Sequence, residues 1–171
     1  MPMKKQTLIN GLNHDLAGEY QATLQYLQHY YVMKGPERLT VGELFKKIAI
    51  GEMKHAEFLA EKIVALGGVP TVTPLPIVQP TTVREMLEAN LAAERQAITD
   101  YAERAEQAEE FGDEGLETEL ENIVAEETRH AEEFEKLLAG AKRGASAPAT
   151  EAKTPARRRK AVKKGSRQRR K

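Results

Sequence analysis

Apolar side chains recur at intervals of three and four residues along most of the chain, which is the spacing of α-helices with one buried face. Four segments show this pattern. They run from about residue 6 to 34, from 40 to the glycines at 67 and 68, from 82 to 112, and from 113 to 140. In the first segment the apolar positions are Leu8, Leu12, Leu16, Leu24, Tyr26, Leu27 and Tyr31. The pattern therefore predicts four long helices.

Helix start and stop signals separate these segments. Thr40–Glu43 and Thr82–Glu85 both have the Thr-x-x-Glu form of a capping box, and Asp113 is a favourable N-cap residue. Between the second and third segments, the stretch "GVPTVTPLPIVQP" contains too many prolines for a helix interior and predicts an ordered crossover loop. Two short connections and one long crossover predict an all-α fold, an antiparallel four-helix bundle.

Charge divides the chain of 171 residues into two parts. Residues 142–171 contain thirteen basic residues and one acidic residue, which gives this segment a net charge of +12. The remainder has 13 basic and 25 acidic residues, a net charge of −12. The basic segment lacks the apolar residues needed to offset chain entropy. We therefore expect a bundle domain over residues 1–140 and a disordered tail over 141–171.

Two further features limit the classes of function. The chain has no cysteine, which excludes disulfide frameworks, thiolate-ligated metal centres and cysteine nucleophiles. The N-terminus turns polar too early for a secretory segment, and no apolar run approaches the roughly 18 residues of a membrane span. These features predict a cytoplasmic protein without a membrane partner.

An internal repeat with an offset of 75 residues relates the two halves of the expected bundle. "LNHDLAGEYQATLQY", from Leu12, aligns with "LEANLAAERQAITDY", from Leu87, and "EMKHAE" aligns with "ETRHAE". Each half therefore contains one glutamate followed, at the same separation, by Glu-x-x-His. The repeated residues are Glu19, Glu52 and His55 in the first half and Glu94, Glu127 and His130 in the second.

This duplication favours a metal site over surface ion pairs, although a single Glu-x-x-His in a glutamate-rich helix is usually such a pair. Glu19 and Glu94 lie in the apolar stripes of their helices, and buried carboxylates repel each other unless cations neutralise them. Four carboxylates balance two divalent ions, and one imidazole per ion in an oxygen-rich set suits iron or manganese. Tyr26 and Tyr101 lie two turns further along the same faces. They either hydrogen-bond these carboxylates or act as core aromatic residues.

On these residues, the chain from about 5 to 140 resembles the ferritin-like superfamily and is most similar to the bacterioferritins. "GEMKHAEFLAEKI" and "LGGVP" also carry the resemblance. It implies two iron ions per subunit, bridged by Glu52 and Glu127, with Glu19 and Glu94 as terminal carboxylates and His55 and His130 completing each set. The implied activity is that of a ferroxidase, in which dioxygen or hydrogen peroxide oxidises ferrous iron for storage in a homo-oligomeric cage.

The same resemblance raises questions about haem and cage size. Met53 matches the methionine that ligates a shared haem b in bacterioferritins, and it lies about 100° around the helix from Glu52, away from the metal pair. Haem ligation and ordinary packing both fit this position. Lys47 and Gly51 replace a histidine and an aspartate that help some bacterioferritins pass iron inward. Gly140 leads into the basic tail without the usual fifth helix, so the cage is either a 24-mer or a dodecamer like that of Dps mini-ferritins.

The basic tail predicts binding to DNA without sequence preference and association with the nucleoid. It contains no aromatic residue for base stacking, so its contacts would be to phosphate. The residues concerned are Arg157, Arg158, Arg159, Lys160, Lys163, Lys164, Arg167, Arg169, Arg170 and Lys171. Two alternative functions fit the same sequence: a protein that chiefly compacts DNA, and a di-manganese catalase or peroxidase on the same bundle.

Overall fold

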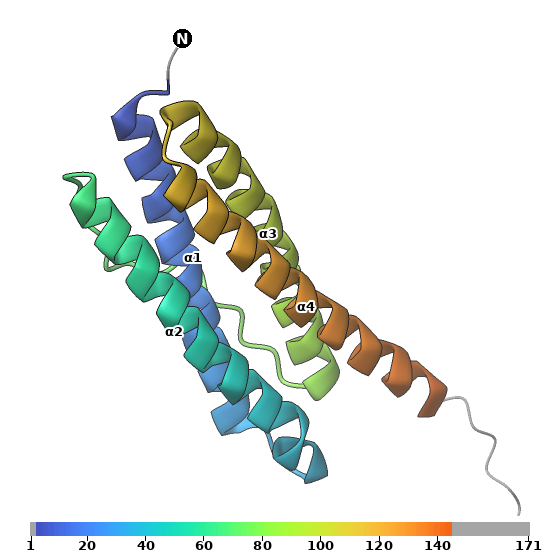
Figure 1. Cartoon of the computed structure of the whole chain (residues 1–171). Helices are drawn as coiled ribbons and strands as arrows, with labels where there is room; N and C mark the ends of the chain where they lie inside the picture. Colours follow the sequence, from blue (N-terminus) through green and yellow to red (C-terminus); the bar gives the residue numbers. More distant parts are fainter. Residues whose placement is uncertain (1–2, 145–171) are drawn as a thin grey trace, which may run out of the picture.

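The computed structural model describes residues 3–144, and these form a four-helix bundle (Figure 1). Its helices are α1 (Lys5–Val32), α2 (Val41–Ala65), α3 (Val83–Phe111) and α4 (Glu114–Gly144), with a short 3-10 helix, η1 (Pro36–Leu39), after α1. Helices α1 and α2 are antiparallel, as are α3 and α4, whereas α2 and α3 run in the same direction. No residue between 3 and 144 forms a strand. The predicted fold class is confirmed.

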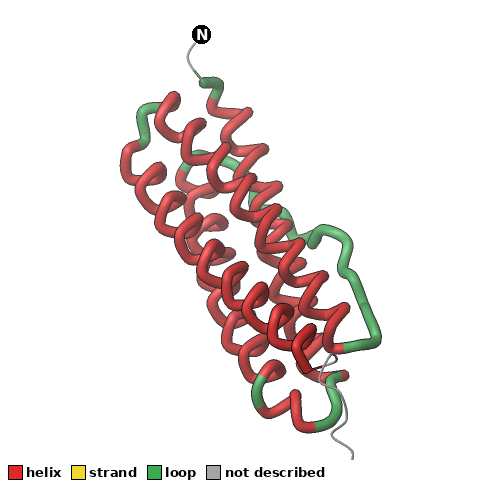
Figure 2. The backbone as a smooth tube through the Cα atoms, turned by 90° about the vertical axis from the view of Figure 1, so that its right-hand side faces the viewer, coloured by secondary structure: helices red, strands yellow, loops and turns green. Residues whose placement is uncertain are grey.

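Residues 66–82 connect α2 to α3 and pass along one side of the bundle (Figure 2). Side chains of α1 hold this crossover in place. The Asn13 side-chain oxygen accepts a hydrogen bond from the Thr71 amide at 2.6 Å, and Gln25 Oε1 accepts one from the Val78 amide at 2.9 Å. Polar groups of α1 thus satisfy backbone groups that a proline-rich loop cannot pair within itself.

Two of the three predicted N-terminal caps form. The Glu85 amide donates to Thr82 Oγ1 at 3.2 Å and the Thr82 amide donates to Glu85 Oε2 at 3.1 Å, which completes the capping box of α3. At the start of α4, Asp113 Oδ1 accepts from the Leu116 amide. The box predicted at Thr40 is wrong, because η1 precedes it and the Thr40 hydroxyl donates to the Glu37 carbonyl instead.

Helix α4 continues past its predicted end at Gly140 and reaches Gly144. An isolated glycine costs a helix about 1 kcal/mol, which weakens the helix without ending it. Residues 145–171 lie outside the described part of the chain, and they include the ten basic residues expected to bind DNA.

Buried hydrophobic side chains form two clusters along the bundle axis. One is centred on Leu12, Leu59 and Leu120, and the other on Tyr26, Phe45 and Phe134. Between the two clusters lies a layer of buried polar residues that all four helices contribute. The hydrophobic clusters hold the helices together and shield this layer from water.

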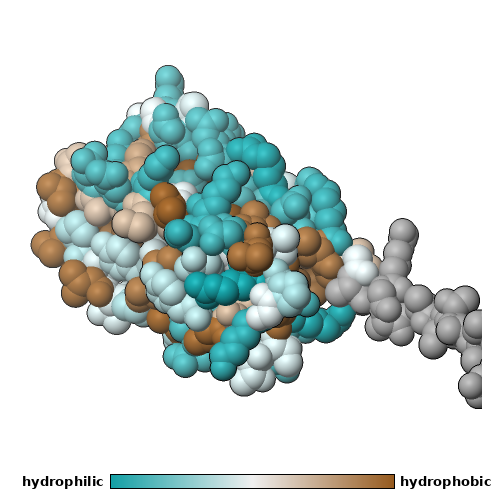
Figure 3. All heavy atoms as spheres, turned by 90° about the horizontal axis from the view of Figure 1, so that it is seen from below, coloured by the Kyte–Doolittle hydropathy of each residue, from teal (hydrophilic) through white to brown (hydrophobic). Residues whose placement is uncertain are grey.

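Viewed from below, the bundle surface is a mixture of hydrophilic and hydrophobic side chains (Figure 3). Large exposed hydrophobic side chains within residues 3–144 come from α1, η1, α2 and the crossover: Leu24, Tyr31, Val32, Leu39, Ile50, Met53, Val64, Val69, Val72 and Val78. Helices α3 and α4 contribute none to this set. Across the described residues, no helix has the length and apolar character needed to cross a membrane.

Candidate metal centre

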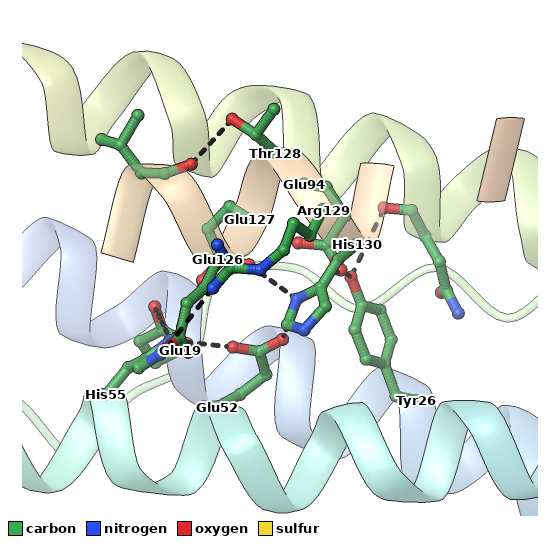
Figure 4. A network of polar contacts seen from close by, with 12 residues as sticks. Glu19, Tyr26, Glu52, His55, Glu94, Glu126, Glu127, Thr128, Arg129 and His130 are labelled. Atoms are coloured by element: carbon green, nitrogen blue, oxygen red, sulfur yellow. Dashed lines mark hydrogen bonds and ion pairs between the residues drawn. The ribbon is translucent and has the colours of Figure 1, made fainter. Parts of the chain in front are cut away.

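The buried polar layer contains five of the six residues of the duplicated sequence motif, and the sixth, His130, lies beside them with a side chain that is 23% exposed (Figure 4). Helix α1 contributes Glu19, α2 contributes Glu52 and His55, α3 contributes Glu94, and α4 contributes Glu127 and His130. The four glutamates are between 1% and 4% exposed. Their burial follows from helical periodicity, because each glutamate takes a place in the inward stripe of its helix.

The six side chains form two overlapping groups of four, each able to hold one ion. Glu19, Glu52, His55 and Glu127 make the first group, which we call the His55 subsite. Glu52, Glu94, Glu127 and His130 make the second, the His130 subsite. In each group the ligand atoms lie within 4.8 Å of one another. The shared members Glu52 and Glu127 are the two residues that the resemblance to bacterioferritins implies as bridges.

Several buried atoms of this cluster lack a hydrogen-bond partner, namely both carboxylate oxygens of Glu52, Oε1 of Glu127 and Nδ1 of His55. The His55 nitrogen lies 3.0 Å from Glu52 Oε2 and 3.0 Å from Glu127 Oε1. These are ion-pair distances without hydrogen-bond angles. Leaving buried polar atoms unpaired is costly, and lone pairs that converge on one volume suit a cation. The residues present therefore fit a pair of metal ions.

The close approach of these groups shifts their pKa values in opposite directions. Burial and the neighbouring Glu52 and Glu127 raise the pKa of Glu19 well above its usual range. Burial alone would lower the pKa of His55, but contacts with Glu127 and Glu52 outweigh it and raise the pKa to about 11. The same balance raises the pKa of His130 to about 12.

Glu94 and Glu127 behave differently from each other although both are buried. Burial raises the pKa of Glu94 well above its usual range, against the effect of His130. Burial would also raise the pKa of Glu127, but its contacts with His130 and His55 hold it well below the usual range. The two imidazoles thus place positive charge next to Glu127, the carboxylate that both subsites share with Glu52.

Two buried tyrosines connect the halves of the repeat. The Tyr26 hydroxyl donates a hydrogen bond to Glu94 Oε1 at 2.7 Å, and the Tyr101 hydroxyl donates one to Glu19. Each tyrosine therefore contacts the glutamate of the other half and not the one on its own helix. Such bonds fix the orientation of a carboxylate that ligates a metal.

Other residues next to the cluster were not anticipated from the sequence. Asp15 and Arg104 form a buried ion pair, with Nε 2.8 Å from Oδ2, one turn from Glu19 and Tyr101 respectively. Glu126 Oε2 lies 3.2 Å from His55 Nε2. The repeat could have pointed to Glu126. This residue adjoins Glu127, and with the offset of 75 its counterpart in the other half is Gly51, which has no side chain.

Met53 faces away from the metal centre and is 56% exposed. With Tyr20, Thr23, Leu24, Ala56, Glu57, Ala60, Val72 and Pro74, it lines a groove between α1, α2 and the crossover. Leu24 and Tyr31 were predicted within the inward stripe of the first helix, but both are exposed. Over the 28 residues of α1, a stripe of regularly spaced residues gradually rotates around the helix axis. Not every residue at apolar spacing therefore remains on the buried face.

Comparisons with known proteins agree with this geometry. Residues 9–144 match the ferritin-like domain family. A bacterioferritin of Brucella melitensis is 35% identical over 77% of this chain and 82% of its own length. A nutrient stress-induced DNA-binding protein of a Synechococcus strain is 31% identical over 77% of this chain and 81% of its own.

Among solved structures, a ferritin-like diiron-carboxylate protein from Bacillus anthracis superposes with a TM-score of 0.78. It is 41% identical in sequence, and the match covers 81% of this chain and 99% of the other. The chain therefore belongs to the ferritin-like family and is of the bacterioferritin type.

Proposed function

We propose that this protein is a ferroxidase that oxidises ferrous iron at the six-residue centre and stores the ferric product in an oligomeric cage. The observation that carries the proposal is the convergence of four buried carboxylates and two imidazoles on one volume, with several of their lone pairs unpaired. The bacterioferritin and diiron-carboxylate relatives support iron as the substrate.

In this proposal the protein binds two ferrous ions as substrate and keeps water out of the site. Glu52 and Glu127 would be shared by the two ions, and each subsite would add one further glutamate and one histidine. Each ferrous ion loses one electron. The two electrons, with two protons, reduce dioxygen to hydrogen peroxide or reduce hydrogen peroxide to two water molecules. The imidazoles lose their Nδ1 protons to solvent as iron binds, and the two protons consumed in this reduction come from solvent.

The proposal is tested by Glu127→Ala, since removing a bridging carboxylate takes a ligand from both subsites. We expect initial ferrous oxidation to fall at least about a hundredfold and bound metal to drop below two ions per subunit. Glu119→Ala, an exposed glutamate on the same helix, is the matched control. Wild-type rates and two bound metals in Glu127→Ala would contradict the assignment. Disproportionation of hydrogen peroxide by manganese-loaded protein, without ferrous oxidation, would favour the di-manganese catalase instead.

We also infer that the face formed by α1, α2 and the crossover packs against another copy of the chain. Within residues 3–144 this face carries the large exposed hydrophobic side chains, and Met53 lines a groove in its middle. An interface there would place two Met53 side chains near each other, where they could ligate one haem b. Met53→Leu nearly preserves volume and should abolish haem absorbance while sparing assembly. If the wild-type apoprotein takes up no haem on reconstitution, Met53 serves only in packing.

Finally, we propose that the basic residues beyond 144 give the assembled cage a second activity, binding to DNA. The support is the +12 charge of residues 142–171 and the name of the Synechococcus relative. Contacts would be to phosphate and independent of base sequence.

A further inference from the structure

The two subsites differ in the partner of the imidazole Nε2, the ring nitrogen that points away from the ligand group. His55 Nε2 lies 3.2 Å from Oε2 of Glu126, a residue that belongs to neither ligand group. The carboxylates within ion-pair distance of His130 are Glu52, Glu94 and Glu127, all members of its own group. Among residues 3–144, His130 thus has no carboxylate from outside its own group within ion-pair distance, as His55 has in Glu126. In Figure 4, Glu126 and His55 lie on the same side of the cluster.

The internal repeat explains this difference. Under the offset of 75, His130 corresponds to His55, and Glu126 corresponds to Gly51. Gly51 has no side chain to offer, and a Cβ placed there would meet nothing within 4 Å. The position is therefore open. The His55 side chain is 9% exposed and the His130 side chain 23%, so the ring without an outer partner is also the one closer to solvent.

We propose that Glu126 is a positioning residue that makes the His55 subsite bind its metal more tightly, so that it fills before the His130 subsite. This rests on the proposed function. In both histidines Nδ1 faces the carboxylates, so Nδ1 must carry the lone pair that ligates and Nε2 must carry the proton. Nε2–H of His55 donates to Glu126, which fixes the tautomer and orientation of the ring and makes Nδ1 a stronger ligand. Among the described residues no carboxylate does this for His130, whose Nδ1 lies 3.0 Å from Glu127 Oε2.

The size of the difference follows from the exposure of Glu126. Removing an outer hydrogen-bond partner of a ligating histidine typically lowers metal affinity by about 10- to 100-fold. The Glu126 side chain is half exposed, and Arg129 Nη2 lies 3.7 Å from its other oxygen. Solvent exposure and the neighbouring Arg129 both weaken the hydrogen bond between Glu126 and His55. We therefore expect the two binding steps to differ by about tenfold, the lower end of that range.

The experiment titrates the apoprotein, in its native assembly, with Co²⁺ and follows visible absorbance and heat. Wild type should bind two Co²⁺ per subunit in two steps of unequal affinity. Glu126→Ala should weaken the tighter step by about tenfold and merge the two steps. Glu126→Gln keeps an acceptor for Nε2–H without the charge and should give an intermediate affinity. Gly51→Glu supplies the missing counterpart and should strengthen the weaker step while leaving the tighter one unchanged.

The outcomes separate this inference from the proposed function. Wild type that binds fewer than two Co²⁺ per subunit would overturn the di-metal function itself. Two steps of equal affinity in wild type, or a Glu126→Ala protein with both steps unchanged or both weakened equally, would overturn only the role of Glu126. If Glu126→Ala does not fold, Gly51→Glu decides alone, because a weaker step that stays unchanged in this variant contradicts the proposal.

Discussion

The two imidazoles of the metal centre hold protons through neutral pH because of their contacts with Glu127 and Glu52. A histidine must be neutral to ligate a metal. At pH 7, binding of two Co²⁺ should therefore release at least about two protons, one each from His55 and His130 and further ones from Glu19 and Glu94, and affinity should rise at least about a hundredfold per pH unit. Calorimetry in buffers of different ionisation enthalpy measures the proton count directly.

The sign of the effect on stability is opposite to that on affinity. The raised histidine pKa values stabilise the apoprotein fully below their usual value of 6.5, and this stabilisation is lost as pH rises through about 11 to 12. His14→Ala is the control, because His14 is exposed and lies outside both ligand groups. Proton release close to zero at pH 7, or an affinity that does not change with pH, would contradict this account.

At the level of single residues, sequence reasoning identified the members of the buried cluster more readily than their partners. Glu52 and His55 lie three residues apart on one helix, and the repeat doubled that signal. The bond from Tyr26 to Glu94 and the pair of Asp15 with Arg104 join different helices. Such contacts depend on the axial shift and rotation of one helix against another, which periodicity along a single helix does not define.

The helices themselves were predictable, because each long apolar stripe lies between clear stop signals. Errors arose where a local alternative competed with the expected cap. Thr40 and Thr82 each begin a Thr-x-x-Glu pattern, yet a capping box forms only at Thr82. At Thr40, the hydroxyl donates a hydrogen bond to the Glu37 carbonyl of the preceding 3-10 helix. A motif of four residues does not show whether the preceding turn has a backbone carbonyl that competes for the threonine side chain.

This pair of threonines gives a prediction at the level of the helix. Thr82→Ala removes the side-chain acceptor of the Glu85 amide and should lower the free energy of unfolding by about 1 kcal/mol, or about 2 to 4 °C in melting temperature. Thr40→Ala, the matched control, removes no N-terminal acceptor and should cost less than about 0.5 kcal/mol. Thermal unfolding of both apoproteins measures the difference. Equal losses in the two variants would show that the capping box adds nothing.

For the whole molecule, the acidic remainder and the basic C-terminal segment predict two separable activities. A chain that ends at Gly144 keeps all of α4 and all six metal-binding candidates. It should oxidise ferrous iron at the wild-type rate and lose DNA binding, because the remainder of the chain is acidic and repels phosphate. For the full chain, each phosphate neutralised should contribute about −0.9 to the slope of log affinity against log salt.

Gel shifts across a salt series, beside ferrous oxidation assays on both proteins, test this separation. Displayed on a cage, many tails would raise the apparent affinity for long DNA above that for short fragments. Equal DNA binding by the shortened chain would place the DNA site within residues 1–144. Loss of iron oxidation on shortening would show that the two activities are coupled.

The most direct test of the central claim is a crystal structure of Co²⁺-loaded protein with anomalous scattering recorded at the cobalt edge. We predict two anomalous peaks per subunit about 3.5 to 4 Å apart. Glu52 and Glu127 should bridge both, with His55 Nδ1 bound to one and His130 Nδ1 to the other. A single peak, or peaks that lie away from these six side chains, would contradict the assignment of this buried cluster as a di-metal centre.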